Sequence, residues 1–410
     1  ACGTLLVGVV GLWGQSVGGR KTGFWAAGIC AVSPLALWYS TDTRVYSLYL
    51  LLAAISLWQF TRALQSNSSM HWFWFSLSSL AGVYTHYYFG LLIAISGLIL
   101  LATKFGEKRI FHRGLTSFFF IALFCLPDFL FLKEDLGQAW GYSRTSEFSL
   151  AAFAFTFFSF FSGYSLGPSL RDLHVISHTA ALKQFIPWLV LLGFPLVILL
   201  VNALRHTPSK RGVNWWLQAF CFGILPVLIV GFVSQQASFG YNARHALWCY
   251  IPLVITVSLG IAWGHPRWLM NGCAILLLGV SLFAIYQRNY SVNHRTEDSR
   301  AVAQYLLRES AREIPLFVLS GYMQETLEFY LPEHWHVLPL GETKPDTTVP
   351  SVYEQISAAA RGEHQIFWLA YSRPFHGDPQ GEILKRLQQE YRLELIRNFS
   401  GFKLYRGHFR

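Results

Sequence analysis

The sequence predicts a mainly α-helical protein: a bundle of about ten transmembrane helices followed by a small α/β domain. Composition is the first reason, because 53% of the 410 residues are hydrophobic and only 13% are charged, whereas soluble domains carry about 25%. The second reason is that apolar runs of near-membrane length recur as far as Tyr286. After Tyr286 the sequence becomes polar with short helix and strand signals, which is typical of a separate soluble domain.

A membrane-spanning helix needs about 20 mostly apolar residues. Residues 1–287, expected to form one membrane domain, contain runs that approach this length. Their expected positions are 3–18, 22–38, 45–62, 71–85, 88–104, 114–132, 184–203, 214–233, 246–264 and 268–286.

Lys and Arg collect in alternate loops between these runs, and loops rich in them face the cytoplasm. These residues are Arg20, Lys21, Arg62, Lys104, Lys108, Arg109, Arg113, Arg205, Lys210, Arg211 and Arg267. The intervening loops and both ends of the chain are therefore expected outside the cytoplasm. A crossing by the Phe-rich run 148–161 would invert this pattern, so we expect the segment near 148–174 to be interfacial or re-entrant. The sequence thus predicts a multi-pass protein of the plasma or inner membrane.

Residues 288–410 are expected to form the soluble α/β domain, outside the cytoplasm. Sequence patterns predict helices at 296–310, 324–331, 352–360 and 379–391, and strands at 316–320, 365–371, 393–399 and 402–406.

The net charge of +10 does not indicate nucleic-acid binding. Lys and Arg outnumber Asp and Glu by 17 to 7 up to Tyr286, while the remaining residues carry 15 of each sign. Basic cytoplasmic loops explain this excess, whereas nucleic acid would require a clustered basic patch on a soluble face. The expected partner is the lipid bilayer. The six cysteines include no CxxC pair and are interpreted as small apolar residues.

The most informative stretch is Ser33–Tyr46, where two apolar runs meet through a short polar turn with Asp42 and Arg44 at its tip. A guanidinium at a membrane interface offers forked donors that match phosphate oxygens. Two other interpretations stay open: Arg44 reaches lipid headgroups from a helix end, and Asp42 forms a simple salt bridge with it.

This turn resembles a motif of polytopic, lipid-phosphate-sugar-dependent glycosyltransferases of the protein-mannosyltransferase-like superfamily, glycosyltransferase family 39 and relatives, which have the GT-C fold. The motif reads Tyr-Ser-x-(Asp/Glu)-x-Arg-x-Tyr, and its positions here are Tyr39, Ser40, Asp42, Arg44 and Tyr46. Further short matches follow in order at Thr85–Tyr88, Gly163–His174 and Asn242–His245. The resemblance therefore extends over nearly the whole chain.

The resemblance implies a sugar donor on a polyprenyl phosphate, and a lipid, glycan or protein hydroxyl that attacks the anomeric carbon with inversion. Arg44, and second Arg244, are the candidates for binding the donor phosphate. The candidates for the pocket around it are Tyr39, Asp42, Tyr46, His86, Tyr87, Tyr88 and His245. Arg171, Asp172 and His174 would form a lid. Alternatively, Arg244 anchors a helix end at the membrane interface, and the aromatic side chains belong to the aromatic belt found at that depth. The segment of the expected lid would then be a plain solvated loop.

The catalytic residues stay unknown. In the family an acidic motif lies in an outer loop after the first span, which would precede Ala1, so the resemblance implies an N-terminally truncated chain. No cofactor is assigned. A divalent metal ion is an alternative way to neutralise the phosphate. Asp42 would be one ligand of that ion, and the other ligands are unknown. A transporter or flippase of lipid-linked glycans, or a non-catalytic membrane scaffold, stays open, although charges midway through the spans are nearly absent.

Overall fold

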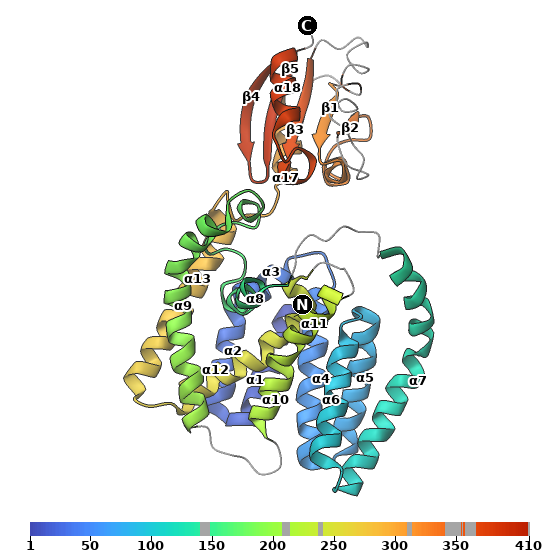
Figure 1. Cartoon of the computed structure of the whole chain (residues 1–410), viewed down its shortest axis with the longest axis vertical. Helices are drawn as coiled ribbons and strands as arrows, with labels where there is room; N and C mark the ends of the chain where they lie inside the picture. Colours follow the sequence, from blue (N-terminus) through green and yellow to red (C-terminus); the bar gives the residue numbers. More distant parts are fainter. Residues whose placement is uncertain are drawn as a thin grey trace. The chain divides into compact units, whose positions relative to one another are not determined.

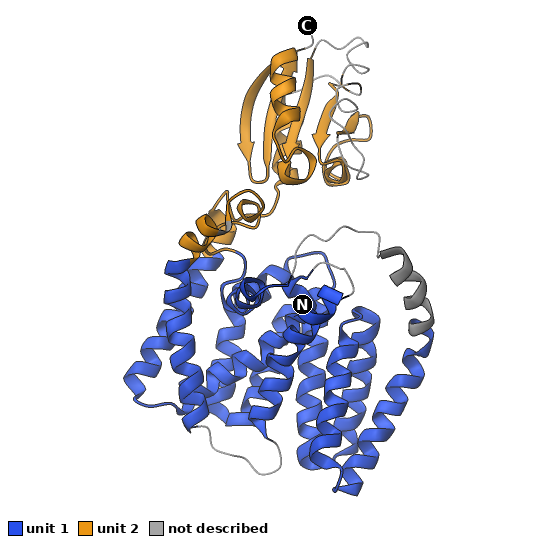
Figure 2. Ribbon diagram, viewed as in Figure 1, with its two compact units in different colours: residues 1–164, 186–285 blue, residues 165–185, 286–410 orange. Residues whose placement is uncertain are grey.

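The computed structural model describes residues 1–139, 148–206, 214–236, 241–309, 314–340, 354, 356 and 366–408. The chain divides into two compact units (Figures 1 and 2). Unit 1 contains Ala1–Tyr164 and Ile186–Ile285, and unit 2 contains Ser165–Phe185 and Tyr286–Arg410. Residues 165–185 were expected in the membrane domain, and the domain boundary expected at 287 stays a prediction.

Unit 1 is built from helices, of which α9 (His178–His206) begins and α13 (Arg267–Tyr290) ends in unit 2. They are α1 (Cys2–Gly18), α2 (Arg20–Ala31), α3 (Pro34–Ser40), α4 (Tyr46–Ser66), α5 (Ser69–Thr85), α6 (Phe89–Lys104), α7 (Lys108–Ala139), α8 (Leu150–Ser162), α9 (His178–His206), α10 (Trp215–Gly223), α11 (Leu225–Gln236), the 3-10 helix η2 (Ala243–Cys249), α12 (Tyr250–Trp263) and α13 (Arg267–Tyr290). Every apolar run expected from the sequence forms a helix or a pair of helices. The predicted class, a polytopic helix bundle with a small α/β domain, is confirmed.

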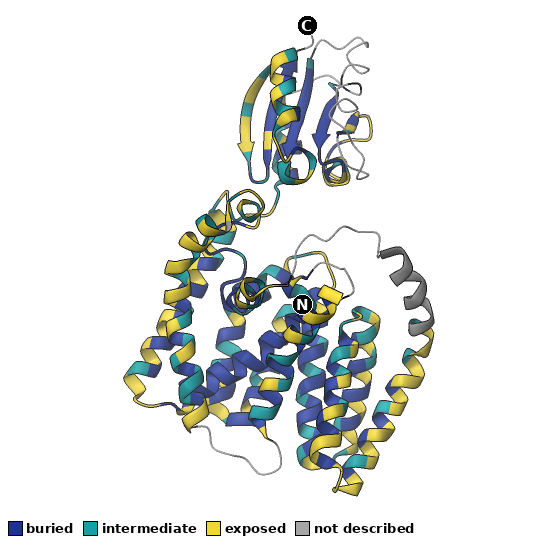
Figure 3. Ribbon diagram, viewed as in Figure 1, coloured by how far each residue is buried: buried dark blue, intermediate teal, exposed yellow. Residues whose placement is uncertain are grey.

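The helices differ in how much of their surface the protein itself covers (Figure 3). α12 packs against α1, α2 and α10, and its residues from Tyr250 to Ala262 are buried. α9 leaves most of its apolar surface exposed, including Phe194 at 64%. Exposed apolar side chains on a helix of this length are expected where hydrocarbon replaces water as the solvent. The chain is therefore an integral multi-pass membrane protein with α12 in its interior.

Fewer helices qualify as membrane spans than the ten expected. Within the described residues, six are long and apolar enough, and the bent pair α2 and α3 raises the number to seven if it is one span. α1, α5 and α6 contain 17, 17 and 16 residues, fewer than the about 20 that a span needs. α2 and α3 meet at 56° because Pro34 cannot continue a helix and disfavours helical backbone at the residue before it.

The Phe-rich run expected at the membrane surface forms α8, a helix of 13 residues. Its first turn is capped by Ser149, whose hydroxyl accepts a hydrogen bond from the Ala152 amide at 3.1 Å. A helix of this length is too short to span the about 30 Å hydrocarbon core, which favours the interfacial or re-entrant interpretation. That interpretation stays a prediction.

Unit 2 contains a five-stranded mixed sheet with the order β2-β1-β3-β5-β4. The strands are β1 (Leu316–Leu319), β2 (Val337–Leu340), β3 (Ile366–Ser372), β4 (Arg392–Phe399) and β5 (Phe402–His408). The helices are η1 (Asp172–His174), α14 (Ser299–Glu309), η3 (Gly321–Met323), α15 (Gln324–Glu328), α17 (Pro374–Gly377) and α18 (Glu382–Glu390). β1 is parallel to β2 and β3, whereas β5 is antiparallel to β3 and β4.

Alternation along the strands gives the sheet two apolar faces. Leu316 and Val318 face a core shared with α14 and α15, and Phe317 and Leu319 face a second core shared with α18. The result is a three-layer α/β/α unit. The helices and strands expected from the sequence here are present, except that β2 was missed. The helix expected at 352–360 lies outside the described residues apart from positions 354 and 356.

Candidate functional site

Seven aromatic side chains of unit 1 form a continuous series of ring contacts, which we call the aromatic row. Its members are Tyr39, Tyr46, Tyr49, His86, Tyr88, Tyr164 and His245. At one end the rings of Tyr88 and His245 stack with centroids 4.5 Å apart and planes inclined by 13°. His86 lies 5.6 Å from Tyr88 and stacks on Tyr49 at 4.7 Å, again between centroids. The row joins side chains from five separate segments of the chain.

At the other end, Tyr39 lies in the last turn of α3. The Ser33 hydroxyl accepts a hydrogen bond from the Ala36 amide at 3.1 Å and thereby caps this helix, with Pro34 at its first position. Gly163 has φ +62°, and a Cβ there would lie 3.0 Å from Pro34 Cβ, so only glycine fits this close approach. The next residue, Tyr164, consequently reaches Tyr39, and the two hydroxyl oxygens lie 2.9 Å apart in a hydrogen bond.

The turn between α5 and α6 positions His86 and Tyr88. Phe89 folds back against Gly82, where an added Cβ would lie 2.2 Å from the Phe89 ring. Phe89 is fully buried, so this contact fixes the geometry of the turn. Tyr87 lies in the same turn but is 50% exposed, and it is not among the members of the row.

Arg244 supplies positive charge to the aromatic row. It lies at the start of η2, where the Asn242 side chain accepts a hydrogen bond from the Arg244 amide at 3.1 Å. The positive charge acts on Tyr39, His86, Tyr88, Tyr164 and His245. Within the described part of the chain, its guanidinium has no hydrogen-bond or ion-pair partner. A half-buried cation beside a row of rings, with its donors free, is suited to bind an anion.

Arg44 and Asp42 lie in the bend between α3 and α4, close in sequence to Tyr39 and Tyr46. Arg44 is exposed, and no described residue forms an ion pair or hydrogen bond with its side chain. The salt bridge with Asp42 that we considered is therefore not formed among these residues. Of the two arginines expected to bind phosphate, Arg244 is the one whose charge reaches the aromatic row.

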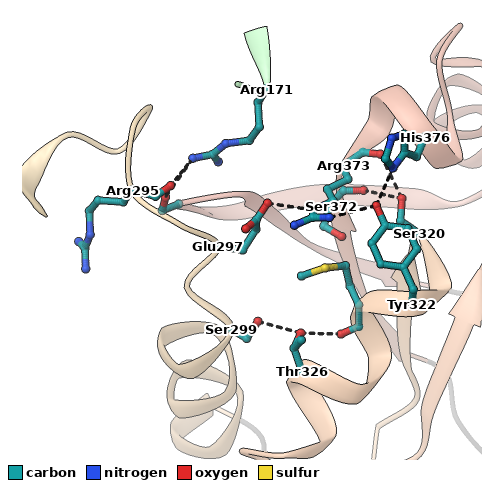
Figure 4. A network of polar contacts seen from close by, with 12 residues as sticks. Arg171, Arg295, Glu297, Ser299, Ser320, Tyr322, Thr326, Ser372, Arg373 and His376 are labelled. Carbon is teal, nitrogen blue, oxygen red and sulfur yellow. Dashed lines mark hydrogen bonds and ion pairs between the residues drawn. The ribbon is translucent and has the colours of Figure 1, made fainter. Parts of the chain in front are cut away.

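The three residues expected to form a lid belong to unit 2. Two of them, Arg171 (Figure 4) and His174, contact the C-terminal part of the chain. Arg171 donates hydrogen bonds to the carbonyl oxygens of Val292, Asn293 and Arg295, the last at 2.7 Å. The ring of His174 stacks on Phe375 with centroids 4.3 Å apart. Asp172 accepts hydrogen bonds from the amide and hydroxyl of Ser169. Movement of this segment as a lid stays a prediction.

No group of three or more His, Cys, Asp or Glu side chains that could hold a metal ion exists among the residues that the structure describes. The aromatic row contains two imidazoles and one nearby guanidinium, and its phenols are weak ligands for a hard divalent cation. We therefore assign neither a metal site nor a catalytic base in this row.

Two members of the row, Tyr49 and Tyr164, were not among the site residues expected from the sequence. Tyr49 follows Tyr46 by three positions on α4, so helical spacing alone places both rings on one face. Tyr164 stands within the Gly163–His174 motif, but its partner Tyr39 is 125 residues away. A contact of that sequence separation requires the fold.

No protein-family model and no curated protein matches the sequence. Among solved structures, the chain is weakly similar to two crystal structures of ArnT from Cupriavidus metallidurans, one in the apo state and one bound to undecaprenyl phosphate. Sequence identity is 13% and 12%, respectively, and the TM-score is 0.43 for both. Each likeness covers 99% of this chain and 82% of that chain. An interpretation of function therefore rests on the sequence motifs and on the aromatic row.

Proposed function

We propose that the protein is a membrane glycosyltransferase that moves a sugar from a polyprenyl-phosphate donor to a lipid, glycan or protein hydroxyl. The observation that carries this proposal is the Arg244 guanidinium, half-buried beside the aromatic row and without a partner among the described residues. The motifs around Tyr39, His86 and Arg244 resemble the superfamily named above, and these residues or their neighbours meet in the row. Arg244 binds the donor phosphate, and Arg44 is the second candidate.

In the proposed reaction, the bond between the anomeric carbon and the phosphate oxygen breaks while the acceptor oxygen forms its bond to the same carbon. The acceptor loses its proton to a general base, for which we name no residue. Negative charge grows on the departing phosphate, and a guanidinium in a site of low polarity stabilises that charge strongly. Ring faces of Tyr46, Tyr88 and His86 offer apolar surface and hydroxyl or imidazole donors to the sugar.

The reaction is proposed to occur at the outer face of the plasma or inner membrane. Arg44 and Arg244 lie at helix ends on the side opposite the basic loops, which are expected in the cytoplasm. With the same expected orientation, unit 2 is proposed to lie outside the cytoplasm.

A transporter or flippase of lipid-linked glycans is the second candidate. The 56° break between α2 and α3 favours it, because broken helices whose ends surround a substrate are common in transporters. Tyr39, at the end of α3, belongs to the aromatic row, so the break lies beside the candidate site.

The two functions differ in whether the sugar–phosphate bond breaks. The full chain, reconstituted in liposomes, is given polyprenyl-phosphate sugars labelled in the sugar, together with candidate acceptors. A glycosyltransferase releases sugar-free polyprenyl phosphate and labels the acceptor, whereas a flippase moves the intact donor between leaflets. Intact donor that changes leaflet would reject our proposal in favour of transport, and inertness in both assays would contradict both functions.

A further inference from the structure

The carboxyl ends of β1 and β3 form a distinct place in unit 2, separate from the aromatic row. The two strands are parallel neighbours, with Leu316 paired to Trp368. From β1 the chain runs through α15 to β2, which pairs with one edge of β1, whereas β3 pairs with the other edge of β1. The connections therefore diverge here, and in open α/β sheets ligands bind in the crevice at such a divergence.

Both strands end in backbone conformations that side chains rarely adopt. Ser320, directly after β1, has φ +61°, and Arg373, directly after β3, has φ +42°. Hydroxyl groups tie the two ends together: Ser320 Oγ donates to the Arg373 carbonyl at 3.0 Å, and Ser372 Oγ donates to the Leu319 carbonyl at 2.9 Å. Such strain persists where surrounding contacts enforce it, and it concentrates at functional sites. The backbone at this edge is therefore rigidly held.

Five side chains gather at these strand ends, and we call them the strand-end cluster: His174, Tyr322, Arg373, Phe375 and His376 (Figure 4 shows three of them). The Tyr322 hydroxyl and His376 Nδ1 lie 2.7 Å apart in a hydrogen bond. The Arg373 guanidinium lies 5.4 Å from the Tyr322 ring centroid and donates from Nη1 to its hydroxyl at 3.5 Å. The His174 and His376 rings are 5.8 Å apart between centroids.

The cluster carries an excess of positive charge. Arg373 Nε donates to Glu297 at 2.9 Å, and the charge of Arg171 acts on the same carboxylate. Arg295 has its own partner, Asp298, at 3.5 Å. The positive charges of two guanidinium groups thus act on one carboxylate, and only Arg373 is in contact with it. Among the described residues, Nη2 of Arg373 has no partner, and the side chain is 32% exposed.

We propose that the strand-end cluster binds a phosphoryl group, presented by a soluble anion or by a lipid headgroup. The free edge of the Arg373 guanidinium would donate to two phosphate oxygens, a geometry for which arginine is suited. The Tyr322 hydroxyl and the imidazoles of His174 and His376 supply further donors. Glu297 holds the guanidinium from the opposite side and leaves its outer edge to the ligand. The site is independent of the proposed glycosyl transfer.

The electrostatics of His174 agree with this assignment. Burial, and then the positive charges of His376 and Arg373, lower the pKa of His174 below its ordinary value of 6.5. These neighbours disfavour the protonated imidazole, and an anion bound beside it would offset their effect.

Histidine footprinting of the full chain in neutral-lipid nanodiscs tests the site, with inorganic phosphate as the probe. Diethyl pyrocarbonate modifies exposed imidazoles, and mass spectrometry reports each rate. Saturating phosphate is expected to slow modification of His174 and His376 by about threefold or more, because occupied sites are shielded. His336 is the internal control, since it is exposed and directly precedes β2, at the amino ends of the parallel strands and opposite to the cluster.

Two variants give the expected dependence on the cluster. Arg373→Lys keeps the charge beside Glu297 but loses the fork, so the phosphate concentration for half-protection should rise about tenfold. Tyr322→Phe, an exposed position, should also weaken protection without affecting folding. Protection that appears in anionic-lipid nanodiscs without free phosphate would identify a headgroup as the ligand, and protection only by free phosphate a soluble anion. No protection in either, or equal slowing at His336, would overturn the proposal.

Discussion

The imidazole of His245 stacks on the ring of Tyr88, with centroids 4.5 Å apart and planes inclined by 13°. This contact joins η2 to the turn between α5 and α6, two segments more than a hundred residues apart. It also holds Arg244, the neighbour of His245, at the end of the aromatic row. The position of the cation that we assign to phosphate binding therefore depends on this stack.

The stack should be measurable as a coupling energy. Tyr88→Leu and His245→Leu each remove one ring, and the double variant should be less destabilised than the sum by about 0.5–1.5 kcal/mol. Unfolding of the detergent-solubilised chain measures all members of the cycle. Strict additivity would show that the two rings are adjacent without stabilising one another.

Gly82→Ala should destabilise unit 1. The new methyl group would lie 2.2 Å from the ring of Phe89, which is fully buried and has no space to move, so we expect a cost of about 1–3 kcal/mol. Gly90→Ala is the matched control, because nothing lies within 4 Å of a Cβ there. Thermal unfolding compares the two variants. Adding Phe89→Ala to Gly82→Ala should remove the clash, and a purely additive loss would argue against it.

Glu297→Gln should alter the acid stability of unit 2. Burial alone would raise the pKa of Glu297, but the hydrogen bond and charge of Arg373, with a contribution from Arg171, outweigh it and lower the pKa below 4.5. Folding thus favours the ionised carboxylate, whose stabilisation is present above the unfolded pKa and is lost as pH falls through the lower folded value. The variant should be less stable than the unsubstituted chain at pH 7, and the difference should shrink below about pH 4.5.

Glu325→Gln provides the control for that experiment, since Glu325 is an exposed carboxylate in the same unit. Melting temperatures from neutral to acid pH are the measurement. A difference between Glu297→Gln and the unsubstituted chain that stays constant down to strongly acid pH would exclude the ionised Glu297–Arg373 pair as its source.

Much of the fold follows from patterns within single segments. Long apolar runs became helices, and short continuous apolar runs located β1 and β3. β2 was missed because Pro339 stands within it, and proline normally argues against a strand; here the strand is at the edge of the sheet, where proline is tolerated. The break before Pro34 was missed because hydropathy alone does not register the missing amide.

The site was predictable only in part. Tyr39, Tyr46, His86, Tyr88 and His245 were expected to line a pocket, and ring contacts do link them. Which arginine accompanies them was not readable from sequence, because Arg44 and Arg244 both stand in short turns between apolar runs. Only the packing of η2 against the α5–α6 turn distinguishes them.

Binding of polyprenyl phosphate to the chain in nanodiscs, measured by native mass spectrometry, tests the central claim about Arg244 most directly. Arg244→Ala should weaken binding by about tenfold or more, as expected for loss of a charged hydrogen bond. Arg244→Lys should fall in between, and Arg20→Ala, which removes an exposed charge at the opposite helix ends, should bind like the unsubstituted chain. Equal affinity of Arg244→Ala and the unsubstituted chain would contradict the assignment of this site.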